Sequence, residues 1–267
     1  MLKEKRHELI LSQLANDGIV QVSKLSEFLK VTDMTVRRDL KELEDKNQLV
    51  RVHGGAKSLD KALPREFSNE EKMLKNKDKK EYIAKIIASL MGDEENIFLG
   101  AGTTIECVSS YINNKNCNIY TNSLYLFEKL KKIRGLRVFL IGGEFRESTG
   151  AFVGSLALDL VEKIRFTKAF IGVNGICDSF AYTYSVDEGV LQSKILDNSN
   201  KAYLIADSSK IGVEDFYAFY NIENADVISD DKIGANGINL IEKHTKLINW
   251  LNENIGYTGW LKKLELI

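Results

Sequence analysis

The chain contains 267 residues, with 37 Lys or Arg against 38 Asp or Glu, so its net charge is −1. Any affinity for nucleic acid must therefore come from a local basic patch, because the bulk charge supplies none. No apolar run approaches the roughly twenty residues of a membrane span and no signal-peptide core follows the N-terminus, so we expect a cytoplasmic protein. Three scattered Cys and three separated His predict neither a disulfide framework nor a metal site or other cofactor.

The first thirty residues predict two helices. Leu9, Ile10 and Leu14 recur at helical spacing in a segment over residues 2–14, which ends before the breaker Asn16-Asp17-Gly18. Ser23 is expected to cap a short second helix. The residues expected to pack that helix under its neighbour are Leu25, Phe28 and Leu29.

The next helix carries a pattern typical of DNA recognition. Thr32 is a favourable N-cap for it. Val36, Leu40 and Leu43 form one apolar stripe, which faces inward in a helix-turn-helix. A solvated surface helix is the alternative interpretation of its basic residues. The outer face, which suits a major groove, carries Met34, Arg38 and Lys41, flanked by Thr35 and Arg37.

A wing is expected after this helix. Residues 49–52 read as a strand, and His53-Gly54-Gly55 reads as a glycine turn. Residues 1–57 therefore predict a winged helix-turn-helix domain, in which 11 Lys or Arg oppose 9 Asp or Glu. The candidate DNA-binding residues are Ser23, Thr32, Met34, Thr35, Arg37, Arg38, Lys41, Arg51 and His53.

A second domain is expected over residues 80–235, after a charged linker over residues 58–79 that contains the single proline, Pro64. Short apolar strands alternate there with helical segments, which predicts an α/β fold with a mostly parallel sheet covered on both faces. For residues 236–267 we expect a tail of one or two helices. The predicted strands cover residues 97–99, 118–120, 138–141, 168–171, 202–205 and 226–228.

Polar, glycine-rich loops follow five of these strands. Ligands bind at the carboxyl ends of parallel strands, so we expect a site where these loops converge. Residues 100–104 open a predicted helix over residues 105–112, and their amides and Thr hydroxyls can hold an anion. The other loops are residues 121–123, 142–146, 172–175 and 207–210.

Both halves of the chain resemble the DeoR family of bacterial transcriptional regulators. In the first half the resemblance rests on Arg6, Ile10 and Leu14, on Thr32-x-x-Thr35-Val36-Arg37-Arg38-Asp39-Leu40 and on residues 49–56. In the second half it rests on the segments GAGTT, TNS, IGGEFR, AFVG, GVNGI, VDEG and DSSKIG, between residues 100 and 212. The resemblance implies a sensor domain similar to ribose-5-phosphate isomerase, a dimer or tetramer, double-stranded operator DNA as partner, and repression of a sugar operon.

The resemblance also implies a phosphorylated sugar as effector. GAGTTIE, GGEFRESTGAFVG, RFTKAF and KIGVEDF look closest to members that regulate lactose operons, whose effector is tagatose 6-phosphate. Members that regulate fructose operons, with fructose phosphates, are close competitors. We expect Lys210 to help the loop over residues 100–104 with the phosphate. The candidate effector residues are Gly100, Gly102, Thr103, Thr104, Asn122, Gly143, Arg146, Asn174, Asp187, Glu188, Lys194 and Lys210.

Two other functions stay open at this point. An isomerase-like enzyme needs a carboxylate base, and the loop after the fourth strand offers Asn174 and Cys177 instead. Asp187, Glu188 and Lys194 could rebuild a catalytic site nearby, although Asp187 and Glu188 could equally cap a helix. An adaptor that binds nucleic acid without any ligand is the other alternative. A fused winged helix favours a regulator, so we predict no enzymatic activity.

Overall fold

The computed structural model divides into two compact units, residues 1–66 and 67–267, which are described separately. The structure describes residues 3–46, 48–52, 54–58, 67–113 and 115–249. None of the helices in these ranges is both long and apolar enough to cross a membrane.

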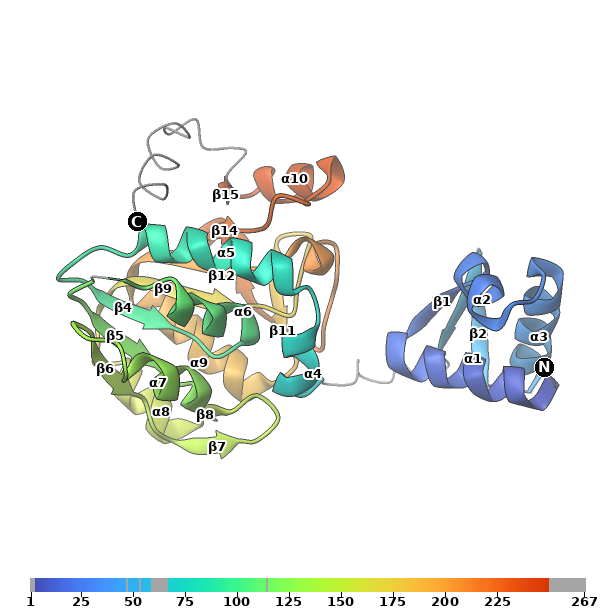
Figure 1. Cartoon of the computed structure of the whole chain (residues 1–267), viewed down its shortest axis with the longest axis horizontal. Coiled ribbons are helices and arrows are strands. Elements are labelled where there is room, and N and C mark those ends of the chain that lie inside the picture. The colour runs from blue at the N-terminus through green and yellow to red at the C-terminus, as the bar shows by residue number, and fades with distance from the viewer. Residues whose placement is uncertain (1–2, 47, 53, 59–66, 114, 250–267) are drawn as a thin grey trace. The chain divides into compact units, whose positions relative to one another are not determined.

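The first unit is a winged helix-turn-helix (Figure 1). Its helices are α1 (Lys3–Asp17), α2 (Val22–Leu29) and α3 (Asp33–Asp45). Its antiparallel sheet has the order β1-β3-β2, with β1 (Ile19–Gln21), β2 (Leu49–Val52) and β3 (Gly55–Ser58). The stripe Val36, Leu40 and Leu43 packs with Ile10, Leu14, Leu25 and Leu29 in one core, as the sequence pattern predicts.

Two local predictions in this unit are wrong. Ser23 does not cap α2: the N-cap is Gln21, two residues earlier, which makes no side-chain capping hydrogen bond, and the helix begins at Val22. The reason is the strand β1, which pairs with β3 and delivers the chain directly into the helix. Phe28 does not join the core but is 55% exposed, because Leu25 and Leu29 already fill the buried face of α2.

The second unit is built on a seven-stranded parallel sheet of order β15-β14-β12-β9-β4-β5-β6. Six of these strands match the predicted apolar runs, so the predicted α/β fold class is confirmed. Their bounds are β4 (Asn96–Leu99), β5 (Asn118–Thr121), β6 (Arg137–Leu140), β9 (Phe166–Gly172), β12 (Ser199–Ile205) and β14 (Asp226–Ile228).

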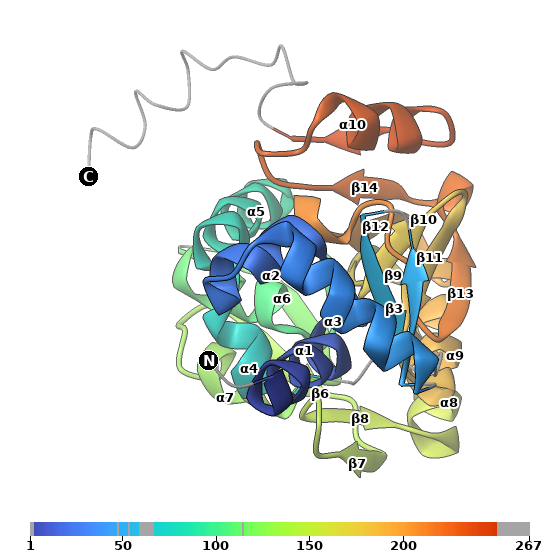
Figure 2. The same cartoon turned by 90° about the vertical axis from the view of Figure 1, so that its right-hand side faces the viewer.

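Helices cover both faces of this sheet (Figure 2). One face packs against α5 (Lys77–Leu90), α6 (Thr103–Glu106), a 3₁₀ turn (Cys107–Ser110) and α7 (Leu124–Leu130). The other face packs against α8 (Ser155–Val161), α9 (Val186–Asp197) and α10 (Ala235–Glu242). The helix predicted over residues 105–112 is therefore wrong in its bounds: one α-helical turn begins at Thr103 and tightens into the 3₁₀ turn.

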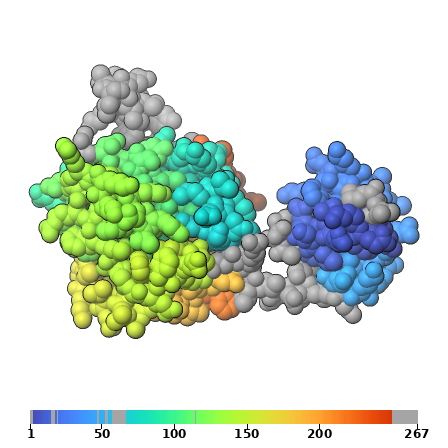
Figure 3. All heavy atoms as spheres, turned by 60° about the horizontal axis from the view of Figure 1, so that its bottom comes forward, coloured from blue at the N-terminus to red at the C-terminus, as the bar shows by residue number. Residues whose placement is uncertain are grey.

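Short antiparallel pieces complete the second unit. A three-stranded sheet has the order β10-β11-β13, with β10 (Gly175–Cys177), β11 (Phe180–Thr183) and β13 (Tyr217–Asn221). Two further 3₁₀ turns cover Ser208–Lys210 and Ile222–Asn224. The hairpin of β7 (Glu144–Arg146) and β8 (Ala151–Val153) lies with α8 on the side that Figure 3 turns toward the viewer.

Both ends of the predicted sensor domain need correction. Residues 67–79, predicted as linker, lie in the second unit: α4 (Asn69–Leu74) precedes α5, and its Asn69 side chain donates a hydrogen bond to Glu106 of α6. The capping box between Ser68 and Glu71 starts α4. At the other end, α10 is followed by β15 (Leu247–Ile248), which pairs with β14 where a helix is predicted. Residues 250–267 of the predicted tail lie outside the described residues.

Candidate functional site

The outer face of α3 is the candidate DNA-binding surface. The Thr32 hydroxyl accepts a hydrogen bond from the backbone N of Thr35 at 3.3 Å, so the predicted N-cap is confirmed. Burial of the apolar stripe leaves Met34 81% exposed and the Arg38 side chain 80% exposed. Arg37 and Lys41 are exposed as well. The helix therefore presents three cations and one flexible apolar side chain to solvent on a fixed framework.

The other predicted DNA-binding residues surround this face. Ser23 and Thr32 are exposed near the ends of α2 and α3. Arg51 is exposed on β2 and is positioned by Glu44, whose carboxylate accepts from the Arg51 backbone N at 2.9 Å and lies 3.8 Å from its guanidinium. His53 lies outside the described residues.

A polar pocket in the second unit is the candidate ligand site. It lies at the carboxyl ends of β4 and β9, which are adjacent in the sheet although β5 and β6 separate them in sequence. The strand order reverses between these two strands, and open α/β sheets bind ligands at such a point. The cavity volume is about 50 Å³. Its lining consists of Asn69, Lys72, Ala101, Gly102, Thr103, Thr104, Ile105, Thr149, Gly172, Val173, Asn174, Thr183, Glu188, Gln192 and Lys210.

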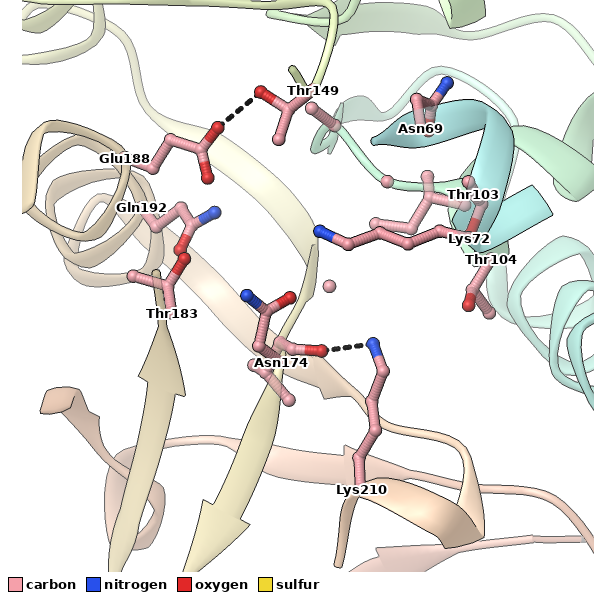
Figure 4. Close-up of a pocket in the computed structure, with 15 residues that line it drawn as sticks. Asn69, Lys72, Thr103, Thr104, Thr149, Asn174, Thr183, Glu188, Gln192 and Lys210 are labelled. Carbon is pink, nitrogen blue, oxygen red and sulfur yellow. Dashed lines mark hydrogen bonds between the residues drawn. The ribbon is translucent and has the colours of Figure 1, made fainter. Parts of the chain in front are cut away.

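One side of the pocket is cationic (Figure 4). Lys72 extends from α4 toward the middle of the pocket, and Lys210 reaches it from the 3₁₀ turn after β12 and donates to the carbonyl of Val173. The pKa of Lys210 is lowered to about 8, chiefly by burial; the charge of Asp207 opposes this shift, and the charges of Lys72 and Lys80 add to it. Burial also lowers the pKa of Lys80, whose Nζ donates to the carbonyl of Lys72. An anion in the pocket would stabilise the ammonium groups of Lys72 and Lys210, which line it.

The opposite side of the pocket carries an acid and an amide on α9. Glu188 is 7% exposed and accepts from the Thr149 hydroxyl at 2.6 Å, with the Arg146 guanidinium at 3.5 Å. Gln192 is 9% exposed, and none of the described residues donates a hydrogen bond to its Oε1. A buried acceptor without a donor is costly, so a ligand hydroxyl would improve this side of the pocket.

Comparison with known proteins identifies the family. A model of the DeoR C terminal sensor domain matches residues 75–232, and a model of the DeoR-like helix-turn-helix domain matches residues 6–62. The chain belongs to the DeoR family of transcriptional regulators. The family resemblance of the sequence is thereby confirmed, and so is the prediction of a regulator rather than an enzyme.

Curated relatives of this DeoR-family chain match it almost from end to end. The lactose phosphotransferase system repressor of Streptococcus mutans serotype c is 39% identical over 251 residues, which cover 93% of this chain and 100% of that protein. The proteins of the same name from Staphylococcus epidermidis (RP62A) and Staphylococcus aureus (N315) are 38% and 36% identical over the same shares. Among solved structures, ribose 5-phosphate isomerase A from Methanocaldococcus jannaschii has a TM-score of 0.38 at 16% identity, over 51% of this chain and 55% of that one.

The pocket of this DeoR-family chain contains half of the predicted effector residues. Gly102, Thr103, Thr104, Asn174, Glu188 and Lys210 line it, and Arg146 contacts it through Glu188. Thr103 and Thr104 are buried at the start of α6.

The remaining five predicted residues do not line the pocket. Asn122 is structural, since its Oδ1 accepts from the Ala101 backbone N at 3.2 Å and its Nδ2 donates to the Phe152 carbonyl at 3.0 Å. Lys194 pairs with Glu162 at 3.2 Å. Asp187 is exposed in the first turn of α9, but the side chain that caps this helix is Ser185, so the capping alternative for Asp187 is wrong. The glycines provide tight packing: a Cβ on Gly100 would lie 3.0 Å from Ile171, and one on Gly143 would lie 2.4 Å from the Val153 carbonyl.

Several lining residues of this DeoR-family pocket escape prediction from sequence. Thr149 lies within the segment GGEFRESTGAFVG but outside the predicted loop over residues 142–146, and Thr183 and Gln192 come from a strand end and a helix outside the predicted loops. Asn69 and Lys72 sit in the charged stretch that was predicted as linker. The one local signal for that helix is the spacing Ser68-x-x-Glu71, which is the pattern of a capping box.

Proposed function

We propose that this DeoR-family regulator represses a lactose-utilisation operon by binding its operator as a homo-oligomer, and that a phosphorylated sugar weakens this binding. The observation that carries the proposal is the two-sided pocket. Its lysines suit a phosphate, and its carboxylate, amide and hydroxyl groups suit the hydroxyls of a sugar. The names of the curated relatives support lactose utilisation as the regulated process.

Tagatose 6-phosphate is the effector we propose first, with a fructose phosphate as the alternative. In this assignment the phosphate binds Lys210 together with the amides and hydroxyls of residues 102–104. The sugar hydroxyls bind Glu188 on the opposite side of the pocket and Asn174, which lies beside Lys210. Arg146 supports the site indirectly, since it lies 3.5 Å from the Glu188 carboxylate.

For operator DNA we propose a major-groove contact by α3. Thr35, Arg37, Arg38 and Lys41 face the groove, with Met34 beside them. Arg51 and His53 lie near the backbone or minor groove in this proposal, and Ser23 and Thr32 near the flanking phosphates. Support comes from the exposure of the described members of this set around a helix whose opposite side is buried.

Pairing of two recognition helices requires a dimer or tetramer. Leu156 and Leu160 support this part of the proposal, because they lie one turn apart on α8 and are both exposed. A surface of this kind suits burial against another chain.

The test uses the full-length protein and a promoter fragment of the lactose operon next to its gene. Gel-shift titrations at one fixed salt concentration should show specific binding that tagatose 6-phosphate weakens. Fructose 1-phosphate and fructose 1,6-bisphosphate are compared at the same concentrations, and free tagatose is the control without phosphate. Binding that no phosphosugar alters would overturn the proposal.

A further inference from the structure

The short helix α4 provides a side of the ligand pocket although it lies before the sensor fold proper. Lys72 is its contribution: the side chain is partly buried, and its ammonium group points to the middle of the pocket (Figure 4). Among the described residues, no acceptor or carboxylate pairs with this ammonium group. A cation that is held without a partner inside a polar pocket is a favourable site for an anion.

On the far side of the same pocket, the side-chain oxygen of Gln192 lacks a hydrogen-bond donor within the part of the chain that the structure describes. Its side chain is more than nine-tenths buried on α9, and its Oε1 receives no hydrogen bond from the described residues. Gln192 thus needs a donor, whereas Lys72 needs an anion. A molecule with a phosphate at one end and hydroxyl groups at the other satisfies both residues at once.

The packing of α4 shows what such a ligand would change. None of the α4 residues is buried, and Leu74 is largely exposed. Polar contacts hold the helix: the Asn69 backbone N donates to the Ser148 carbonyl at 3.0 Å, and its Nδ2 donates to Glu106 at 2.9 Å. Water can replace such hydrogen bonds at little net cost, so α4 belongs to the least stably held elements of the unit.

The size of the pocket requires movement of one side. A cavity of about 50 Å³ has room for only a few water molecules, whereas small-molecule sites measure about 300–1,000 Å³. The sheet loops and α9 pack into the hydrophobic cores, but α4 does not. The element that can move aside and close again is therefore α4.

We infer that α4 is an effector-binding element: Lys72 binds the anionic group of the effector, Gln192 accepts a hydrogen bond from one of its hydroxyls, and the bound effector ties α4 to α9. This inference rests on the proposed function, since it names two further residues of the same site. α4 is the first helix of the second unit, so it directly follows the chain segment that comes from the DNA-binding unit. A ligand that holds α4 therefore acts on the point where this segment enters the second unit. In this way effector binding is coupled to the chain segment that joins the two units.

Calorimetry on the full-length protein tests the inference, with tagatose 6-phosphate and fructose 1-phosphate as probes. Lys72→Gln should weaken binding of the better probe about 10- to 100-fold, and Gln192→Met about 3- to 10-fold. Lys77→Gln is the matched control, because its side chain is 80% exposed outside the pocket and removes the same charge. Thermal melts without ligand establish that each variant is folded.

Amide hydrogen exchange provides a readout that a purely structural role would not move. The better probe should slow exchange over residues 69–74 in the wild-type protein and in Lys77→Gln, but much less in Lys72→Gln. Wild-type affinity in a folded Lys72→Gln variant, or exchange in α4 that ligand leaves unchanged, would overturn the inference while the proposed function stands. If the wild-type protein binds neither probe, both fail.

Discussion

Arg6 of α1 donates two hydrogen bonds to the Asp39 carboxylate of α3, from Nε to Oδ2 at 2.7 Å and from Nη2 to Oδ1 at 2.9 Å. The Asp39 side chain is 2% exposed and the Arg6 side chain 13% exposed, so this planar pair is shielded from water. Asp39 is next to Arg38, which faces the opposite way into solvent. The pair therefore fixes the rotation of α3 about its axis, and with it the surface offered to DNA.

Removal of Arg6 should destabilise the first unit without touching the DNA-binding surface. Arg6→Ala leaves the buried Asp39 carboxylate without its guanidinium partner and with only the His7 imidazole nearby, at 3.4 Å, and loss of one member of a buried pair costs about 3–5 kcal/mol. Chemical denaturation should show this loss. The variant should also lose operator affinity, because α3 is no longer held. An unchanged unfolding midpoint would show that the pair does not position the helix.

Substitution of Arg38 or Lys41 should weaken operator binding and leave the stability of the first unit nearly unchanged. Arg38→Ala should cost about 1–3 kcal/mol of operator binding if Arg38 contacts a guanine edge. Its ion pair with Glu42 is exposed, at 3.6 Å, so the free energy of unfolding should change by less than about 0.5 kcal/mol. Lys5→Ala on α1 is the charge-matched control. Operator affinity that stays at the wild-type value in both Arg38→Ala and Lys41→Ala would contradict the proposed surface.

Much of the fold is predictable from sequence because its signals are local. The stripe Val36, Leu40 and Leu43 sets the buried face of α3 without knowledge of the rest of the chain. The buried parallel strands appear as apolar runs for the same reason. The strands β1 and β15 are not predicted from sequence, because three and two residues are too few to show the alternating pattern of a strand. Only pairing with a strand distant in sequence defines them. The tertiary partner, and not the local pattern, decides such segments.

Effector affinity should fall as the pH rises through about 8. The folded pKa of Lys210, about 8, lies below its ordinary value of 10.5, chiefly because of burial. The ammonium form that attracts an anion is therefore fully present only below this pH, and a bound phosphate should raise the pKa again. Calorimetry at pH 8.5 in buffers of different ionisation enthalpy should detect proton uptake on binding. Lys210→Met should abolish the uptake; uptake of the wild-type size in this variant would contradict the assignment.

Glu188 and Lys194 lie on the same helix and should respond differently to substitution. Glu188 lines the pocket, so Glu188→Gln should weaken effector binding about tenfold through the loss of a charged acceptor. Lys194 pairs with Glu162 away from the pocket, so Lys194→Gln should leave the affinity within about twofold. Isothermal titration of both variants decides between the pocket and the broader set of polar residues predicted from sequence. Equal losses would favour the broader set.

The site is less predictable than the fold, and Asn122 shows why. Its residue type and its place after a strand suit a ligand contact, but its amide links the loop after β4, through Ala101, to strand β8, through Phe152. Lys72 shows the opposite error, because a lysine in a charged stretch gives no sign of the pocket to which it belongs. A polar residue type tells what a side chain can bind, whereas its partner depends on contacts between elements far apart in sequence.

If one protein couples operator binding to a phosphorylated sugar, the two ligands must obey thermodynamic linkage. Operator affinity is measured with and without saturating tagatose 6-phosphate, and affinity for tagatose 6-phosphate is measured with and without operator duplex, at the same salt and pH. We expect one and the same factor in both experiments, of about 5- to 150-fold, with each ligand weakening the binding of the other. A factor of one in both experiments, with both ligands bound, would contradict it.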